Sequence, residues 1–262
     1  MGSSSEYVFG DNDTAARRLD LVAREWHWPS AAFLRELGLP PPGLALDLGC
    51  GPGRTTRLVA ATTAASSTVG IDTSESFLAR ARADAPAGMT FLEHDVMDLP
   101  FPTGPADLVY ARFVLSHLPR PDRIVAGWMG ALAPGGVLAL DEVERIDTDD
   151  ATLSRYLEIL GALMEIRGSA LAAGPIVDRF DGGPDGRKRT SETRVHRVSV
   201  AAAAELFALN FETWRHEPFV EDNYRARDLD NLAAALRELA SRPGGAEITW
   251  TMRQATFERD AS

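Results

Sequence analysis

The sequence predicts an α/β fold, a doubly wound and mostly parallel seven-stranded sheet with helices on both faces. Short apolar runs alternate with segments of helical periodicity between about residues 44 and 143. The first of these runs passes through a cluster of glycines directly into a helix. With 262 residues, the chain is also long enough to bury a sizeable core.

Composition restricts the classes of partner. Hydrophobic residues make up 45% of the chain and charged residues 25%, as in an ordinary globular protein. A net charge of −11 disfavours nucleic acid and anionic membrane surfaces as partners. The single cysteine, Cys50, excludes an internal disulfide and fits a reducing compartment. Because no apolar run reaches membrane-spanning length and no signal stretch opens the chain, we expect a cytoplasmic protein.

The first half of the chain divides into a helical segment and a core. Residues 11–38 have helical periodicity with a break near Pro29, so we assign residues 1–40 to an N-terminal helical cap. The core, residues 41–144, contains the alternating elements. Strands are expected at 44–48, 68–72, 89–94, 107–112 and 136–143, and helices at 54–61, 74–84 and 121–132.

The pattern changes after about residue 145. We expect an inserted lid or substrate-recognition region at 145–198 and the C-terminal part of the sheet at 199–262. The elements expected here are a helix at 150–168, a helix at 201–209, a strand at 211–219, a helix at 226–240 and a closing strand at 247–257. A glycine-rich, charged segment at 174–193 contains a loop signal at 180–186. The N-terminal helices and the insertion should lie over the carboxyl ends of the strands, where open α/β sheets bind ligands.

The turn after the first strand is the most informative motif. Residues 47–54 read D-L-G-C-G-P-G-R, a strand–glycine turn–helix unit whose backbone can approach a ligand closely. A dinucleotide-binding turn needs G-x-G-x-x-G or A, but Arg54 occupies the position that must be small. The spacing therefore disfavours NAD and FAD.

The segment 47–53 has an acidic residue, one further residue and then G-x-G-x-G. This pattern resembles motif I of the class I S-adenosylmethionine (SAM)-dependent methyltransferases, in particular the ubiquinone/menaquinone-biosynthesis-like enzymes that act on small molecules. Asp72 ends the second expected strand, as an acidic residue does in that family. Three more segments carry the resemblance in the right order: H-D-V-M-D-L-P-F at 94–101, D-L-V-Y-A-R-F-V-L-S-H at 107–117 and L-A-P-G-G at 132–136. The resemblance covers about residues 44–143 and implies a Rossmann-like fold, SAM as the methyl donor and S-adenosylhomocysteine (SAH) as the product.

The resemblance also implies a set of cofactor-binding residues. In that family the acidic residue at the position of Asp72 accepts the ribose hydroxyls, the one at Asp95 meets the adenine amino group, and Val96 or Met97 covers the ring. The implied cofactor-binding set is Tyr7, Arg18, Asp47, Gly49, Cys50, Gly51, Gly53, Asp72, Thr73, Asp95, Val96, Met97, Ala111 and Arg112. The plainer alternatives are a helix-terminal charge for Asp72, a turn residue for Asp95 and a solvated helix charge for Arg18. Cys50 is interpreted as a small apolar filler of the turn.

Methyl transfer is an in-line displacement, so alignment of the reactants can contribute about 7–11 kcal/mol. His117 follows the fourth strand and is the candidate general base, because histidine titrates near working pH. A histidine that caps the next helix is the alternative. Glu142 is a candidate partner of His117 or of the acceptor. The acidic run at 141–150 has oxygen ligands that suit Mg²⁺, but no spacing in it demands a metal, and we expect none.

The leading interpretation is a SAM-dependent methyltransferase that methylates O, N or electron-rich C of a small organic acceptor. A catalytically silent SAM-fold partner or regulatory module is the alternative. An NAD(P)-dependent reductase is disfavoured by Arg54 and by the lack of a Tyr-x-x-x-Lys pair, since Lys188 is the only lysine. One lysine beside many arginines and alanines suggests a high-GC bacterial genome and a secondary metabolite as acceptor. We expect a monomer or a homodimer.

Overall fold

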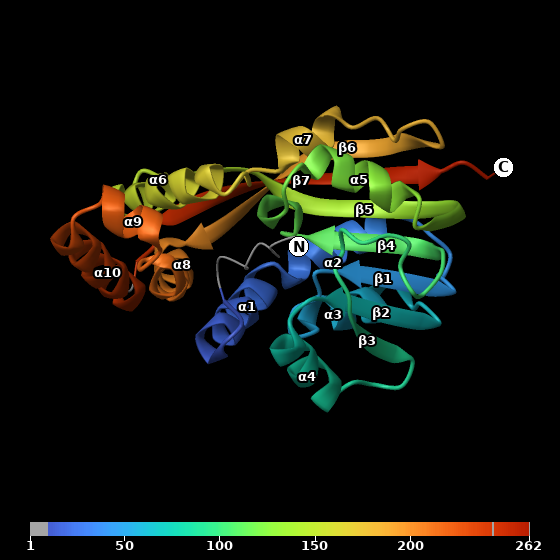
Figure 1. Ribbon diagram of the computed structural model, residues 1–262, viewed down its shortest axis with the longest axis horizontal. Helices are drawn as coiled ribbons and strands as arrows, with labels where there is room; N and C mark the ends of the chain where they lie inside the picture. The colour runs from blue at the N-terminus through green and yellow to red at the C-terminus, as the bar shows by residue number, and fades with distance from the viewer. Residues whose placement is uncertain (1–9, 243, 262) are drawn as a thin grey trace.

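The computed structural model describes residues 10–242 and 244–261. Its centre is a seven-stranded sheet with the order β3-β2-β1-β4-β5-β7-β6 (Figure 1). Strands β1 to β5 pair in parallel, and β7 pairs antiparallel with both β5 and β6. The strands are β1 (Leu44–Leu48), β2 (Ser67–Asp72), β3 (Met89–Glu93), β4 (Ala106–Arg112), β5 (Leu132–Asp147), β6 (Gly186–Ser199) and β7 (Glu247–Arg259). The predicted fold class is confirmed.

Helices precede the sheet, cover its two faces and extend beyond one end of it. They are α1 (Asp13–Glu25), α2 (His27–Glu36), α3 (Arg54–Thr63), α4 (Glu75–Ala83), the short 3₁₀ helix η1 (Leu115–His117), α5 (Pro121–Met129), α6 (Ala151–Ile166), α7 (Gly174–Arg179), α8 (Val200–Trp214), α9 (Pro218–Asn223) and α10 (Ala226–Ser241). Side chains of Asn12, Ser74, Asp150 and Ser199 accept hydrogen bonds from the first free N–H groups of α1, α4, α6 and α8. Within the described residues, no helix combines the length and the apolar character needed to cross a membrane.

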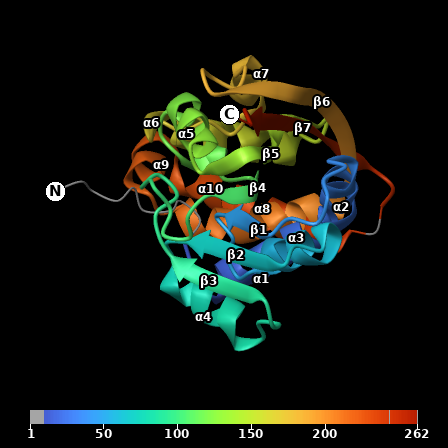
Figure 2. The same ribbon diagram turned by 90° about the vertical axis from the view of Figure 1, so that its right-hand side faces the viewer.

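Both faces of the central strands are buried, which explains why their sequences read as continuous apolar runs. In β4, Leu108 and Tyr110 pack against α2 and α3, whereas Val109 and Ala111 face α5 and α7. Figure 2 places α3 and α5 on opposite sides of the strands. The two layers of helices hold the carboxyl ends of the parallel strands in fixed positions.

A second core lies beyond those strand ends. Arg112, the last residue of β4, pairs with Asp141, but β5 continues to Asp147 and there pairs with β7 alone. The helices α6, α8, α9 and α10 gather around this projection (Figure 1). The rings of Tyr156 and Phe207 stack inside it with centroids 4.1 Å apart. Because α1 also packs against α8, helical material covers the ends of the strands, as the sequence predicts.

One predicted element is wrong, and one strand was not predicted. Residues 211–219 were expected to form a strand, but they end α8 and begin α9, because Phe211 and Trp214 continue the buried face of α8 at helical spacing. The glycine-rich segment 174–193 has the expected loop at residues 180–185, but it also contains α7 and the first half of β6, which the sequence analysis does not predict. This edge strand is exposed on both faces for most of its length and carries many charged side chains, so it shows no apolar periodicity. Part of the region 145–198 thus belongs to the sheet.

Candidate functional site

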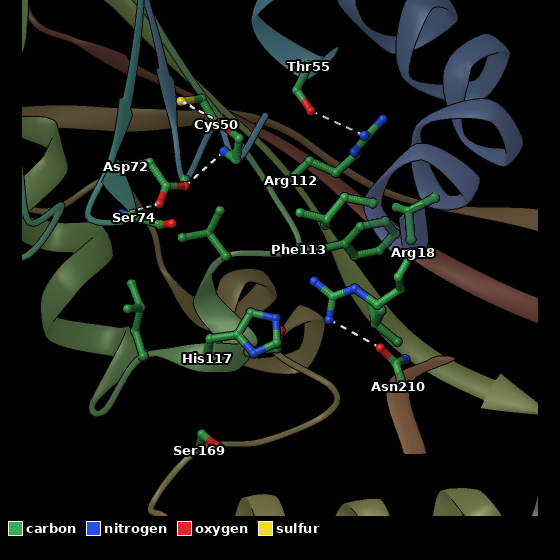
Figure 3. Close-up of a pocket in the computed structure, with 18 of the residues that line it drawn as sticks. Arg18, Cys50, Thr55, Asp72, Ser74, Arg112, Phe113, His117, Ser169 and Asn210 are labelled. Carbon is green, nitrogen blue, oxygen red and sulfur yellow. Dashed lines mark hydrogen bonds between the residues drawn. The ribbon is translucent and has the colours of Figure 1, made fainter. Parts of the chain in front are cut away.

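A cavity of about 1000 Å³ opens where the parallel strands end, and α1, α6 and α8 form its other walls. Figure 3 shows Arg18 from α1, Asn210 from α8 and Asp72 from the end of β2 among the residues that line it. Of the residues expected at the site, most line this cavity: Arg18, Gly49, Cys50, Gly51, Asp72, Thr73, Asp95, Val96, Met97, Arg112 and His117. Asp47, Gly53, Ala111 and Glu142 are not part of its lining, and Tyr7 lies outside the described residues.

The glycine turn forms one end of the cavity. Gly49 and Gly53 have φ of +65° and +79°, a region that residues with a Cβ rarely adopt. A Cβ on Gly49 would lie 2.7 Å from Val114 Cγ2, and one on Gly53 would lie 2.8 Å from the Phe91 ring. The glycines therefore let the loop after β4 and the strand β3 pack directly against the turn.

Asp47 and Cys50 support the turn from inside. Asp47 is 1% exposed and its Oδ2 accepts a 2.7 Å hydrogen bond from the Thr56 hydroxyl, which ties β1 to α3. Burial raises the pKa of Asp47 to about 7. The backbone N–H of Cys50 donates to Ile71 O at 3.0 Å and joins the turn to β2. Burial also raises the pKa of the Cys50 thiol, so this side chain is a neutral filler and not a nucleophile.

Asp72 projects into the cavity from the end of β2. Its two carboxylate oxygens accept the backbone N–H groups of Gly51 at 2.8 Å and Ser74 at 2.9 Å (Figure 3). Burial raises its pKa, and the two N–H donors oppose that shift. Each carboxylate oxygen has more than one lone pair, so Asp72 can still accept hydroxyl donors from a ligand.

The segment after β3 forms the neighbouring part of the wall. Asp95 Oδ1 accepts the N–H of Met97 at 2.9 Å, which fixes the turn. Val96 is buried, and its carbonyl accepts the indole N–H of Trp128 at 2.8 Å. Met97 is 37% exposed. An acceptor and two apolar side chains thus lie together, as recognition of a flat heterocycle with an amino group requires.

Arg112 is anchored at the end of β4. Its guanidinium donates to the hydroxyls of Ser30 at 3.1 Å and Thr55 at 3.2 Å. The Ser30 hydroxyl in turn donates to Asp141 Oδ2 at 2.8 Å. Asp141 is 1% exposed and also accepts from Gln254, so this network connects α2, α3, β4, β5 and β7.

Glu142 supports the loop that follows β4. It is fully buried, and its Oε1 accepts the backbone N–H groups of Val114 at 2.8 Å and Leu115 at 3.0 Å. Burial raises the pKa of Glu142 to about 8. Phe113, at the start of this loop, has a φ of +58° that a residue with a Cβ adopts at a cost. The Glu142 carboxyl therefore fixes the position of η1, which carries His117.

His117 and Arg18 meet on the cavity wall. In Figure 3 the Arg18 guanidinium lies between the His117 ring and the Asn210 amide. Arg18 is 3% exposed and donates to Asn210 Oδ1 at 3.1 Å. Burial, aided by the charge of Arg18, lowers the pKa of His117 to about 3. His117 is therefore neutral at neutral pH.

The end of the cavity away from the glycine turn is apolar. Trp26, Phe113, Met164, Phe207 and Trp250 line the cavity together with the polar Asn210, and the sequence analysis identifies none of them as site residues. The edges of Phe113 and Trp250 meet the Trp26 ring at centroid distances of 5.3 Å. These contacts join residues far apart in the chain, which no local pattern reports.

The acidic run at 141–150 does not converge on one point. Among residues 10–242 and 244–261, no group of three or more His, Cys, Asp or Glu side chains is arranged to hold a metal ion. Within that run, Asp150 caps α6 and Asp147 pairs with Arg145 at 2.7 Å.

Comparison with known proteins gives matches that centre on the strand–turn–helix core. Residues 46–140 match the family described as "Methyltransferase domain". A trans-aconitate 2-methyltransferase of Methylobacterium radiotolerans is 36% identical over 146 residues, which are 56% of this chain and 55% of that protein. A protein of the same name from Variovorax paradoxus is 38% identical over 112 residues, or 43% of each chain. The chain spans about half the length of the curated relatives it matches.

Solved structures resemble the chain over most of its length. The cyclopropane synthase MmaA2 of Mycobacterium tuberculosis superposes with a TM-score of 0.56 at 19% identity, over 98% of this chain and 90% of that one. The plantazolicin methyltransferase BpumL, solved in complex with SAH, gives a TM-score of 0.52 at 15% identity over 97% and 92% of the two chains. At these identities the likeness shows a shared fold.

Proposed function

We propose that this chain is a class I SAM-dependent methyltransferase, which transfers the methyl group of SAM to a small organic acceptor. The match of residues 46–140 to a methyltransferase domain and the likeness to trans-aconitate 2-methyltransferases support this proposal. One observation carries the proposal. A single cavity of about 1000 Å³ has the glycine turn and Asp72 at one end and an apolar chamber at the other, with His117 and Arg18 between them. That volume is at the upper end of the range for small-molecule sites, as a site for two ligands requires.

The residues at the glycine-turn end fit SAM. We assign the Asp72 carboxylate to the ribose hydroxyls and the segment 95–97 to the adenine, with Asp95 accepting from the amino group. Thr73 and the backbone of Gly49–Gly51 line the same end. We assign Arg18 to the carboxylate of the methionine part, because a buried guanidinium on the wall pairs well with an anion. SAM, when bound, supplies a methyl group on a positively charged sulfur.

The residues beyond the glycine turn orient the acceptor. Glu142 acts through the backbone of residues 114–115 and is a positioning residue in this proposal. His117, held by η1, is neutral because its pKa is lowered to about 3, so its ring can accept a hydrogen bond from an acceptor O–H or N–H. A histidine with so low a pKa retains a proton poorly. We therefore propose that His117 aligns the acceptor, and we no longer favour it as the general base.

The region between β5 and β6 is assigned to acceptor choice. Its helix α6 supplies Leu157, Leu160 and Met164 to the cavity wall. The boundaries 145–198 given to this region, the identity of the acceptor as a secondary metabolite and the monomeric or homodimeric state stay predictions.

The assignment of Asp72 gives the sharpest test. Glu93 pairs in register with Asp72 at the end of β3 but is exposed and lies off the cavity wall, so it is a matched control. Calorimetric titration with SAH should give an affinity at least about tenfold weaker for Asp72→Ala, and unchanged for Glu93→Ala. Lost hydrogen bonds to a charged group have a free energy of about 1.5–3 kcal/mol, which corresponds to that change or more. Binding of NADH in place of SAH, or equal SAH affinity in wild type and Asp72→Ala, would contradict the proposal.

A further inference from the structure

The far end of the cavity has a composition of its own. We call it the acceptor chamber and define it by six apolar side chains: Ile146, Leu157, Leu160, Met164, Phe207 and Trp250. They come from β5, α6, α8 and β7. All six lie outside residues 46–140, the part that matches the methyltransferase domain family. The chamber is therefore built by residues outside the part of the chain that matches this family.

Negative charge is confined to the other end of the cavity. The acidic side chains on the wall are Asp11, Asp72 and Asp95, which all belong to the glycine-turn end. No Asp or Glu is found among the described residues that line the acceptor chamber. A cation entering it would lose its water without gaining a carboxylate, which is costly. The chamber therefore disfavours a protonated amine.

The positive charges on the wall are already engaged by other groups. The four arginines that line the cavity are Arg18, Arg54, Arg112 and Arg167. Arg54 pairs with Asp20 at 2.8 Å and Arg167 with Glu217 at 2.7 Å. Arg112 donates to two hydroxyls, and Arg18 is assigned to the methionine carboxylate of SAM. A molecule with several carboxylates, such as trans-aconitate, would meet no cluster of unengaged arginines among the described residues of the chamber.

We propose that the acceptor is an uncharged molecule with an apolar, ring-bearing body that fills the acceptor chamber. This inference rests on the proposed function and names its substrate class. Apolar surface gains free energy when it leaves water, and aromatic walls such as Phe207 and Trp250 favour flat rings. The chamber therefore selects by charge as well as by size. An uncharged acceptor would set this chain apart from its curated relatives, which are named for trans-aconitate, a molecule with several carboxylates.

Probes that share one apolar body and differ in charge test the proposal. Protein saturated with SAH is titrated calorimetrically at pH 7 with 2-naphthol, 2-naphthoate, 2-naphthylmethylamine and trans-aconitate. We expect the neutral naphthol to bind at least about tenfold more tightly than either charged naphthyl probe, and trans-aconitate to bind most weakly. Equal or tighter binding of any charged probe, or no binding of 2-naphthol, would overturn the proposal. If the protein does not bind SAH at all, the proposed function fails instead.

Variants with a new carboxylate locate the binding. Leu157→Asp and Ile146→Asp put a charge on the chamber wall, whereas Ile166→Asp puts it on the same helix α6 at a side chain that is 66% exposed and off the wall. The two wall variants should lose at least about tenfold in affinity for 2-naphthol, and Ile166→Asp should match wild type. SAH affinity within twofold of wild type shows that a variant is folded. The naphthol affinity of a wall variant that meets this condition tests the location of the site. Unchanged naphthol affinity in that variant would refute the acceptor chamber as the binding site.

Discussion

Glu142 makes the stability of this protein depend on pH in a predictable direction. The carboxyl is fully buried, Oε1 accepts two backbone N–H groups, and Oε2 has no hydrogen-bond partner among the described residues. Burial raises its pKa from 4.5 to about 8. Between these values the native state keeps a proton that the unfolded chain has released, so the contribution of Glu142 to the free energy of unfolding falls as pH rises. Each pKa unit corresponds to about 1.4 kcal/mol, so the upper limit of this loss is about 5 kcal/mol.

The substitution Glu142→Gln removes this titration. The amide keeps an oxygen for the N–H groups of Val114 and Leu115, and its NH₂ replaces the O–H that the protonated acid already buries. We expect the variant to be as stable as wild type at pH 5 and more stable at pH 8, by about 2–5 kcal/mol. Other buried groups add the same background to both proteins. Asp47, whose pKa is raised to about 7, contributes a slope of the same sign, and His117, whose pKa is lowered to about 3, contributes a slope of the opposite sign below about pH 6.5.

Urea unfolding at intervals between pH 5 and 8 measures the difference. Glu158→Gln is the control, because that carboxylate is exposed on α6 and pairs only with Arg155 at 2.8 Å in the described structure. Its profile should be parallel to that of wild type. The reasoning is refuted if Glu142→Gln also runs parallel to wild type, or if it is less stable than wild type at pH 8.

Two further predictions concern the turn and the histidine. Gly49→Ala should lower the free energy of unfolding by about 1–3 kcal/mol, because the new Cβ meets Val114 at 2.7 Å. Gly135→Ala, which has a similar φ of +76° but open space around its Cβ, separates backbone strain from the clash, and an equal loss in both would argue against the close approach. His117→Ala should lower kcat at least about tenfold while the affinity for SAM stays within twofold, and the wild-type pH–rate profile should show no histidine titration between pH 5 and 8. A wild-type titration near pH 6.5 that vanishes in His117→Ala would restore the role of general base.

The central sheet could be predicted because the side chains of its parallel strands are buried on both faces. Residues 44–48 and 107–112 are buried on both faces, so continuous apolar runs mark them without any knowledge of their neighbours. The glycine turn was equally accessible, since positive φ and close approach leave glycine as the residue that fits at positions 49, 51 and 53. Asp72 followed from its place at the end of an identified strand. Local physics determines each of these features.

The edge of the sheet was not accessible in the same way. β6 carries Arg187, Lys188, Glu192 and Arg194 on a surface that solvent reaches from both sides, so its pairing with β7 leaves no apolar pattern. The opposite error occurred at 211–219. There Phe211 and Trp214 were interpreted as strand residues, although their spacing of three matches the face of α8 that contains Phe207. Only packing against Tyr156 of α6 decides between the two interpretations.

The apolar composition of α6 is a sequence signal from which the acceptor chamber could have been predicted. An amphipathic surface helix has one apolar stripe, but α6 carries buried Leu153, Tyr156, Ile159, Leu160, Leu163 and Met164, with Leu157 half-buried beside them. These residues cover more of the circumference of α6 than a helix needs to pack against a single core. In the structure, part of it packs against α8 and α10 and the rest faces the cavity. A helix apolar over so much of its surface must bury two sides, and in this chain the second side lines the cavity through Leu157, Leu160 and Met164.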